Sequence, residues 1–217
     1  DRQLEAGWRA LEAAATLPSQ TFDFHAALAD TLLAGRVREL VTVREGEDIV
    51  AILPLCRRRR WLAGWHAAGP RQVYEPVDAL CRDEAAVQAL ADRLARLSRP
   101  LKFDRIPAGS PLVPALKARM KGRGLFVIRP AQASPRIDFA TGPRDPEQRF
   151  NSGRRSDFRR ARRRAEAIGE VAFEMQSPAP GEFDALFEQA VAIEDSGWKA
   201  EAGTALASDA AKAGFFG

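Results

Sequence analysis

The stretch 39–55, ELVTVREGEDIVAILPL, carries the pattern that decides the fold. Two runs rich in valine, isoleucine, leucine and threonine, residues 39–44 and 49–55, flank a short polar segment, Glu45-Gly-Glu-Asp48. Such residues are enriched in strands, and a short glycine-containing segment between two strand-like runs is typical of a β-hairpin. We therefore predict an antiparallel strand pair here, the clearest one in the chain.

Helices are predicted on both sides of this hairpin. A first helix is indicated by apolar residues that recur at helical spacing: Leu4, Trp8, Leu11 and Ala15. Pro18 ends this pattern, and a second helix at residues 24–33 is closed by Gly35. After the hairpin, Asp83 and Glu84 open a helix with one apolar face, formed by Val87, Leu90, Ala91, Leu94 and Leu97.

The rest of the chain continues this alternation and indicates a mixed α/β (α+β) fold. Further strands are predicted at residues 101–106, 125–129, 136–139 and 170–175. Further helices are predicted from Ser110-Pro111 to Gly122, across the arginine-rich segment, around Phe183, Leu186, Phe187 and Ala190, and at 205–213. The turn composition of Thr141–Pro146 marks a boundary between a domain at 1–140 and a second one at 141–217. No strand follows the last helix, so we expect the second domain to continue beyond Gly217.

Composition limits the class of protein. The chain has 217 residues, 46% hydrophobic and 29% charged, which suits one large or two small domains with hydrophobic cores. Cys56 and Cys81 lack a metal-type spacing, and His25 and His66 lack partners at ligand spacing, so no metal site is expected. Reduced cysteines and the absence of an apolar run of about 18 residues indicate a cytoplasmic protein without a transmembrane segment.

The most unusual segment is the arginine-rich one at residues 149–164. Its eight arginines and single acid, Asp157, give a net charge of +7, whereas the whole chain carries +4, so the other residues sum to −3. The arginines are Arg149, Arg154, Arg155, Arg159, Arg160, Arg162, Arg163 and Arg164. Gly169 ends this helix, and we expect its narrow apolar stripe to pack against the protein; the stripe comprises Phe158, Ala161, Ala165 and Ile168.

Three interpretations of this helix are open. In the first it is a solvated face, although acids normally alternate with bases there and like charges at i,i+4 destabilise a helix by about 0.2–0.5 kcal/mol. In the second, Arg155 and Arg159 bind a sugar phosphate, a lipid-linked saccharide or a CoA phosphate through paired guanidinium hydrogen bonds. In the third, the helix binds tRNA; no DNA-binding motif frames it, so DNA is not an expected partner.

A second basic run, Arg57–Arg60, follows the hairpin and precedes Trp61, Trp65 and His66. Arginines beside aromatic residues suit contact with phosphates or with a membrane surface. Charge at the end of a strand also protects a sheet edge from pairing with other chains, which is the simpler interpretation.

Several local motifs resemble the Fem-like tandem GNAT proteins. In the first half these motifs are Trp8-x-x-Leu11, Ile52-Leu-Pro-Leu55, Tyr74-x-x-x-Asp78, and Lys102-x-Asp104-x-Ile106-Pro107 before Ser110-Pro111. In the second half they are the arginine-rich helix, Gly169 before a predicted strand, and Trp198-Lys199 near Gly203-Thr204-Ala205. The combination is similar to the bacterial acetyltransferases associated with cellulose and exopolysaccharide synthesis.

This resemblance implies a GNAT-like domain followed by the beginning of a second one, with acetyl-CoA or another acyl-CoA as co-substrate. The implied activity is transfer of an acyl group to an amine or hydroxyl of a sugar-related or cell-envelope acceptor, with a backbone amide polarising the thioester. The alternatives are an aminoacyl-tRNA-dependent Fem-like transferase and a non-catalytic module that binds RNA or anions. No catalytic residue is assigned; the candidate substrate-binding residues are Tyr74, Asp78, Arg155, Arg159, Trp198 and Lys199.

The sequence shows no site for the acyl donor. GNAT proteins bind the pyrophosphate of acyl-CoA at a turn with the pattern Q/R-x-x-G-x-G/A, where the turn opens a helix. The nearest match is Arg119-Met-Lys-Gly-Arg-Gly124, but these glycines follow a predicted helix and are expected to end it. A donor site beyond Gly217 and a degenerate domain that never bound CoA both fit this pattern.

Overall fold

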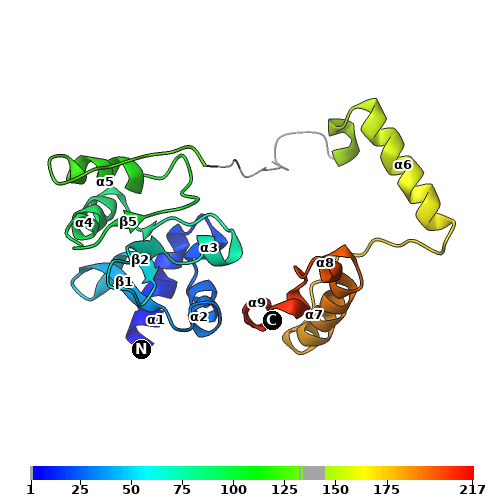
Figure 1. Ribbon diagram of the computed structural model, residues 1–217, viewed down its shortest axis with the longest axis horizontal. Coiled ribbons are helices and arrows are strands. Elements are labelled where there is room, and N and C mark those ends of the chain that lie inside the picture. The colour runs from blue at the N-terminus through cyan, green and yellow to red at the C-terminus, as the bar shows by residue number, and fades with distance from the viewer. Residues whose placement is uncertain (1, 132, 134–144) are drawn as a thin grey trace. The chain divides into compact units, whose positions relative to one another are not determined.

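The structure is a computed structural model that describes residues 2–131, 133 and 145–217 (Figure 1). Its α-helices, 3-10 helices (η) and strands are α1 (Arg2–Leu11), η1 (Glu12–Ala14), η2 (Pro18–Gln20), α2 (Phe22–Asp30), β1 (Val37–Glu45), β2 (Asp48–Arg57), β3 (Trp65–Ala67), α3 (Pro70–Val73), β4 (Leu80–Cys81), α4 (Glu84–Ala95), β5 (Leu101–Lys102), α5 (Leu112–Met120), η3 (Pro146–Arg149), α6 (Ser152–Glu166), α7 (Pro180–Asp195), α8 (Trp198–Glu201), η4 (Leu206–Ser208) and α9 (Ala210–Phe216). This order confirms the predicted mixed α/β class. None of the described helices combines the length and the apolar composition that crossing a bilayer requires.

The chain forms two compact units. The first comprises residues 1–132 and 187–217 and contains the five-stranded sheet, and the second comprises residues 133–186 and contains α6. The C-terminal residues join the first unit partly through Phe215, whose ring centroid lies 5.3 Å from that of Phe24. The predicted boundary at Thr141 lies outside the described residues, and the division at residue 140 stays a prediction.

The hairpin predicted from residues 39–55 lies at the heart of the sheet. Strands β1 and β2 pair antiparallel along their length, and Gly46 in the turn has a φ of +61°, as a two-residue hairpin turn requires. A register shift after Val43 leaves Val50 without an opposite residue. Because this bulge interrupts the alternation of faces, Ile49 and Ile52 join the same apolar cluster although they are three residues apart.

The remaining strands extend the sheet from the other edge of β2. Both β3 and β4 pair with that edge antiparallel, through Leu55–Ala67 and Ile52–Leu80, respectively. Strand β5 then pairs with β3 in parallel. The strand predicted at residues 101–106 is therefore shorter than expected, because only Leu101 and Lys102 find a partner.

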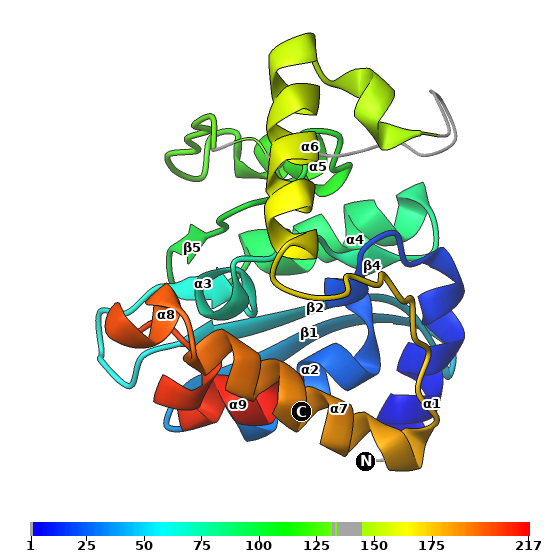
Figure 2. The same ribbon diagram turned by 90° about the vertical axis from the view of Figure 1, so that its right-hand side faces the viewer.

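Helices cover both faces of the hairpin, with α4 on one side and α1 and α2 on the other (Figure 2). The face of α4 predicted to be apolar is buried at Val87, Leu90, Ala91 and Leu94 and packs with Leu53 and Leu55 of β2 and Leu112 and Leu116 of α5. On the opposite face the cluster consists of Trp8, Leu11, Ile49, Ile52 and Leu80. Both helical layers thus depend on the apolar side chains of β2.

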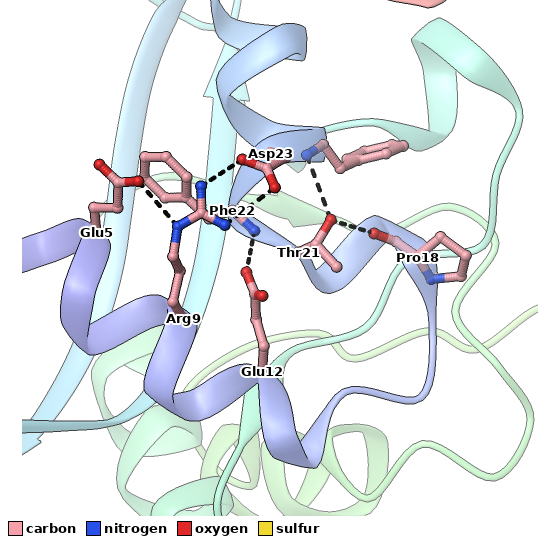
Figure 3. A network of polar contacts seen from close by, with 8 residues as sticks. Glu5, Arg9, Glu12, Pro18, Thr21, Phe22 and Asp23 are labelled. Atoms are coloured by element: carbon pink, nitrogen blue, oxygen red, sulfur yellow. Dashed lines mark hydrogen bonds and ion pairs between the residues drawn. The ribbon is translucent and has the colours of Figure 1, made fainter. Parts of the chain in front are cut away.

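Polar contacts connect α1 to α2 on the outside of this layer (Figure 3). Arg9 donates to Oε1 of Glu5 at 2.9 Å and to the two carboxylate oxygens of Asp23 at 2.6 and 3.1 Å. Glu12 accepts a hydrogen bond of 2.6 Å from the backbone N–H of Phe22. This last contact satisfies a donor in the first turn of α2, which has no partner within the helix.

Two predicted strands do not form. Residues 125–129 and 170–175 lie outside helices and strands, and Leu125, Phe173 and Met175 are 87%, 84% and 100% exposed. A strand requires a neighbouring strand for its N–H and C=O groups, and neither segment has one among the described residues. The strand predicted at residues 136–139 lies outside the described part of the chain.

Helix α6 confirms the predicted arginine-rich helix, but the packing predicted for its apolar stripe is wrong. Asn151 caps the helix by accepting a hydrogen bond of 2.9 Å from the N–H of Arg154. No residue of α6 is buried, and Phe158 and Ile168 are 45% and 91% exposed. Helix α7 also forms as predicted without burying its apolar residues, since Phe183 is 40% exposed.

Replacing Leu90 by alanine tests the dependence of the fold on the α4 layer. Leu90 is fully buried between α4 and the sheet, so we expect Leu90→Ala to lower the free energy of unfolding by about 2–5 kcal/mol. The matched control is Arg93→Ala on the exposed face of the same helix, with an expected change within about 0.5 kcal/mol. Urea denaturation followed by circular dichroism measures both, and equal losses would contradict the packing described above.

Candidate functional site

A pocket of about 580 Å³ lies beside Asp78 in the first compact unit. It is bounded by the N-terminal segment around Gln20, by β4, by the start of α4 and by α5. Its volume falls in the range of small-ligand sites. The polar part of its lining consists of Thr16, Gln20, Asp78, Cys81, Asp83, Glu84 and Gln88.

Asp78 is a partly buried carboxyl in this pocket. Its Oδ1 accepts a hydrogen bond of 2.8 Å from the hydroxyl of Ser110 and another of 2.8 Å from the N–H of Ala79. Burial raises the pKa of this carboxyl above its ordinary value, and the two hydrogen bonds oppose that shift. Among the described residues no donor contacts Oδ2, so this oxygen is the one available to a ligand.

The turn η2 fixes the backbone on both sides of Asp78. The side-chain amide of Gln20 donates to the carbonyl oxygen of Ala79 at 2.9 Å. The hydroxyl of Ser19 donates to the carbonyl oxygen of Pro76 at 2.5 Å. Gln20 and Ser19 are 5% and 2% exposed, so these hydrogen bonds are shielded from water and hold the carboxylate in a defined position.

The lining of the pocket is acidic. Of the described residues that form it, three carry carboxylates, Asp78, Asp83 and Glu84, and none is basic. The N–H of Ala86 and the guanidinium of Arg82 both donate to Asp83 and hold its pKa below the ordinary value. The pocket therefore attracts cations and amines and repels phosphates.

Cys81 is not the nucleophile of this pocket. Burial, together with the charges of Asp78 and Asp83, raises the pKa of its thiol to about 12. The thiol thus stays protonated at neutral pH, and a protonated thiol is a poor nucleophile.

Tyr74, the other predicted residue of the motif that contains Asp78, does not line this pocket. It is 66% exposed, and the guanidinium of Arg105 lies 5.2 Å from its ring centroid. Tyr74 and Arg105 both have a positive φ, at 63° and 58°, which is uncommon for residues other than glycine. The substrate-binding role of Tyr74 stays a prediction.

Arg155 and Arg159 lie on α6 in the second compact unit and differ in their contacts. The side chain of Arg155 donates to the carbonyl oxygen of Phe150 at 2.5 Å, which ties it to the start of its own helix. Arg159 is exposed, and no side chain of the described residues is bonded to it. Of this pair, Arg159 is therefore the better placed to bind an anion from solution.

Trp198 and Lys199 open α8 and have separate environments. Trp198 is 72% exposed. Lys199 forms an ion pair with Glu194, and its carbonyl oxygen accepts a hydrogen bond of 2.9 Å from the N–H of Thr204. Lys199 thus connects α7 to the turn after α8, and these contacts with other described residues are structural.

The remaining titratable groups do not assemble a second site in the described part of the chain. His25 is buried between Trp8 and Phe24, and burial lowers its pKa to about 4, so it is neutral at neutral pH. No group of histidines, cysteines and carboxylates among the described residues has a geometry that holds a metal ion. Gly122, with a φ of +77°, follows the end of α5, which confirms that the glycines after Arg119 end a helix.

Two residues that support Asp78 are not anticipated by the sequence pattern. The pattern indicates Ser110 only as the start of a helix, and it gives Gln20 no role. Their partners Asp78 and Ala79 lie 32 and 59 residues away, so no local pattern could have indicated these contacts.

No protein-family model, curated protein or solved structure matches this chain. The assignment of the candidate site therefore depends on its geometry.

The raised pKa of Asp78 predicts a specific dependence of stability on pH. The carboxyl of Asp78 binds its proton more tightly in the folded protein than in the unfolded chain. Its ionisation therefore lowers the stability of the folded protein as the pH rises from 3.8 through the folded pKa. Asp78→Asn keeps an oxygen that accepts from Ser110. We therefore expect the variant to gain stability relative to the parent protein as the pH rises above 3.8.

Asp83→Asn is the matched control, for which the expected change in stability with pH has the opposite sign. The pKa of Asp83 is lowered in the folded protein, so its charge contributes stability that is present above the unfolded pKa and is lost as the pH falls. This variant should lose stability relative to the parent protein as the pH rises from the folded pKa of Asp83 to the unfolded value of 3.8, and the difference should stay constant above that interval. Urea denaturation at a series of pH values measures both, and parallel trends would contradict the environments described for the two carboxylates.

Proposed function

We propose that the chain is an acyltransferase that uses an acyl-CoA and transfers the acyl group to an amine of a sugar-related or cell-envelope acceptor, with Asp78 as the general base. The proposal is carried by one observation, the partly desolvated carboxylate of Asp78 in an acidic pocket of small-ligand size. The GNAT-like motifs of the sequence supply the reaction class. The mixed α/β fold with an open five-stranded sheet is compatible with that class.

The environment of Asp78 suits proton transfer. A raised pKa brings a carboxyl closer to the range in which it accepts a proton efficiently at neutral pH. In the proposed reaction Oδ2 takes one proton from the acceptor ammonium, and the freed amine nitrogen attacks the thioester carbonyl. The carbon–sulfur bond then breaks, and the CoA thiolate leaves with the second proton that the nitrogen loses as the amide forms. The hydroxyl of Ser110 holds the carboxylate in place from Oδ1 during this step.

The charge of the pocket favours an amine over a hydroxyl. The carboxylates of Asp78, Asp83 and Glu84 attract an ammonium group and concentrate it beside the base. A neutral hydroxyl gains little from this field. An amino sugar is therefore the acceptor class that the lining supports best.

The phosphates of an acyl-CoA need a different set of residues. No described residue of the Asp78 pocket is basic, so the pocket is assigned to the acceptor. Helix α6 offers exposed arginines, and the guanidinium of Arg159 suits phosphate oxygens.

The alternative function, RNA or anion binding without catalysis, is favoured by the exposure of α6. The helix carries seven arginines against Asp157 and Glu166, and only Arg160 and Arg162 form ion pairs with these acids. Like charges at i,i+4, as at Arg159 and Arg163, cost helix stability, and an anionic partner would offset this cost.

Acyl transfer from acetyl-CoA to glucosamine tests the proposed reaction. We expect transfer to glucosamine but not to glucose, and Asp78→Asn should lower kcat/KM by about 10²–10⁴-fold, since that is the usual contribution of a general base. Binding of acetyl-CoA, measured by calorimetry, should be unchanged in this variant. Asp30→Asn, an exposed carboxylate outside the pocket, is the control with activity unchanged.

The proposal fails if the chain neither binds nor hydrolyses acetyl-CoA. Equal transfer to glucose and glucosamine would remove the assignment of an amine acceptor. A loss of activity in Asp78→Asn that is matched by loss of folding would remove the assignment of the base, and the unfolding measurements above distinguish that case.

Binding of bulk tRNA at increasing salt tests the alternative. If α6 binds phosphates, the logarithm of the affinity falls linearly with the logarithm of the salt concentration, and Arg159→Ala with Arg163→Ala should reduce the slope by about 1 for each arginine that binds a phosphate. Arg93→Ala with Arg96→Ala removes the same charge from an exposed part of α4 and its C-cap and should leave the slope unchanged. A slope near zero for the parent protein excludes the alternative.

A further inference from the structure

The loop between β2 and β3 presents two adjacent apolar side chains to solvent. Trp61 is 80% exposed and Leu62 is 73% exposed. They directly follow Arg58, Arg59 and Arg60, which are all exposed. Large apolar side chains that are exposed together within a charged rim mark an interaction surface.

The backbone of this loop is anchored to the segment before β5. The side chain of Arg99 donates a hydrogen bond to the carbonyl oxygen of Trp61, and the N–H of Trp65 donates to the carbonyl oxygen of Pro100 at 2.8 Å. A Cβ at Gly64 would lie 2.7 Å from the same oxygen of Pro100, so the close approach requires glycine. The two exposed side chains are therefore presented by a supported backbone.

The charge around the loop is uniformly positive in the sequence, since no acid occurs between Asp48 and Glu75. The paired start of β1 adds further arginines, because Arg38 lies opposite Cys56 at the end of β2. Among the described residues, no carboxylate forms an ion pair with Arg36, Arg38, Arg58, Arg59 or Arg60. These charges are available to an external anion.

We infer that the segment Arg58–Leu62 docks the protein on a bilayer surface that contains anionic lipids. Tryptophan favours the boundary between headgroups and acyl chains, and leucine favours the hydrocarbon beneath it. Arginines beside them bind the headgroup phosphates and carboxylates of an anionic leaflet. The sequence Arg-Arg-Arg-Trp-Leu supplies these contacts from one loop.

A bilayer fits this loop better than a protein or an RNA. Two exposed apolar side chains are far too few for a stable protein interface, which buries about 800 Å² on each partner. The phosphates of an RNA would bind the arginines and a base would stack on Trp61, but an RNA has no apolar group to pack against Leu62. The membrane accounts for both apolar side chains together with the charge.

Co-sedimentation of the chain with lipid vesicles tests this inference. Vesicles of phosphatidylcholine with added phosphatidylglycerol should bind the protein, and vesicles of phosphatidylcholine alone should not. Arg58→Ala with Arg60→Ala should weaken binding about fivefold for each arginine, since each cation near an anionic surface contributes about that factor. Arg93→Ala with Arg96→Ala removes the same charge from exposed positions on α4 and at its C-cap and should leave binding unchanged.

Tryptophan fluorescence separates docking by this loop from attraction to other basic segments. Trp8 and Trp65 are buried, so a blue shift on anionic vesicles reports Trp61 or Trp198. We expect Trp61→Phe to abolish the shift and Trp198→Phe to retain it. A shift that persists in Trp61→Phe overturns the inference, as does binding that survives Trp61→Ala with Leu62→Ala but disappears when Arg159 and Arg163 are replaced. Binding to bulk tRNA that disappears in Arg58→Ala with Arg60→Ala, without binding to vesicles, identifies RNA as the partner and also overturns it.

Discussion

Strand β2 is paired along both edges and covered on both faces, and the other elements of the first compact unit depend on it. Strand β1 satisfies one row of its backbone groups, and β3 and β4 satisfy the other. Its side chains from Ile49 to Leu53 are buried between two helical layers. The buried N–H and C=O groups of such a strand need hydrogen-bond partners, which neighbouring segments of the chain supply. This requirement fixes which segments lie beside it.

The candidate pocket follows from the pairing of β4 with β2. The pairs Ala51–Cys81 and Ile52–Leu80 place the segment before β4 against the sheet, and the side-chain amide of Gln20 bonds the carbonyl group of Ala79. Asp78 is thereby partly withdrawn from water while Ser110 compensates only one of its oxygens. Burial therefore raises the pKa of this carboxyl above its ordinary value.

The two ends of the β1–β2 hairpin have opposite charge. The turn end contains Glu45, Glu47 and Asp48, and the other end contains Arg36, Arg38 and the run from Arg57. Because the hairpin is long, these charges are separated and do not neutralise one another, which leaves the loop from Arg58 to Leu62 positive and apolar. The same strand that orders the pocket through its middle thus presents a basic surface at its end.

The sequence by itself determined the elements whose signals are local. The hairpin, α1, α4 and α6 were predicted, because strand composition around a glycine turn, helical spacing of apolar residues and capping residues act over a few neighbouring positions. The mixed α/β class was predicted as well, and the role of Asp78 as a site residue stays a prediction. Only the tertiary structure decided that Ser110 and Gln20 support Asp78, that Tyr74 lies outside the pocket, and that residues 125–129 and 170–175 form no strands. These outcomes depend on contacts between residues that are distant in the sequence. The burial of Asp78, which raises its pKa, and the presence of a neighbouring strand, which a strand requires for its hydrogen bonds, are both set by such contacts.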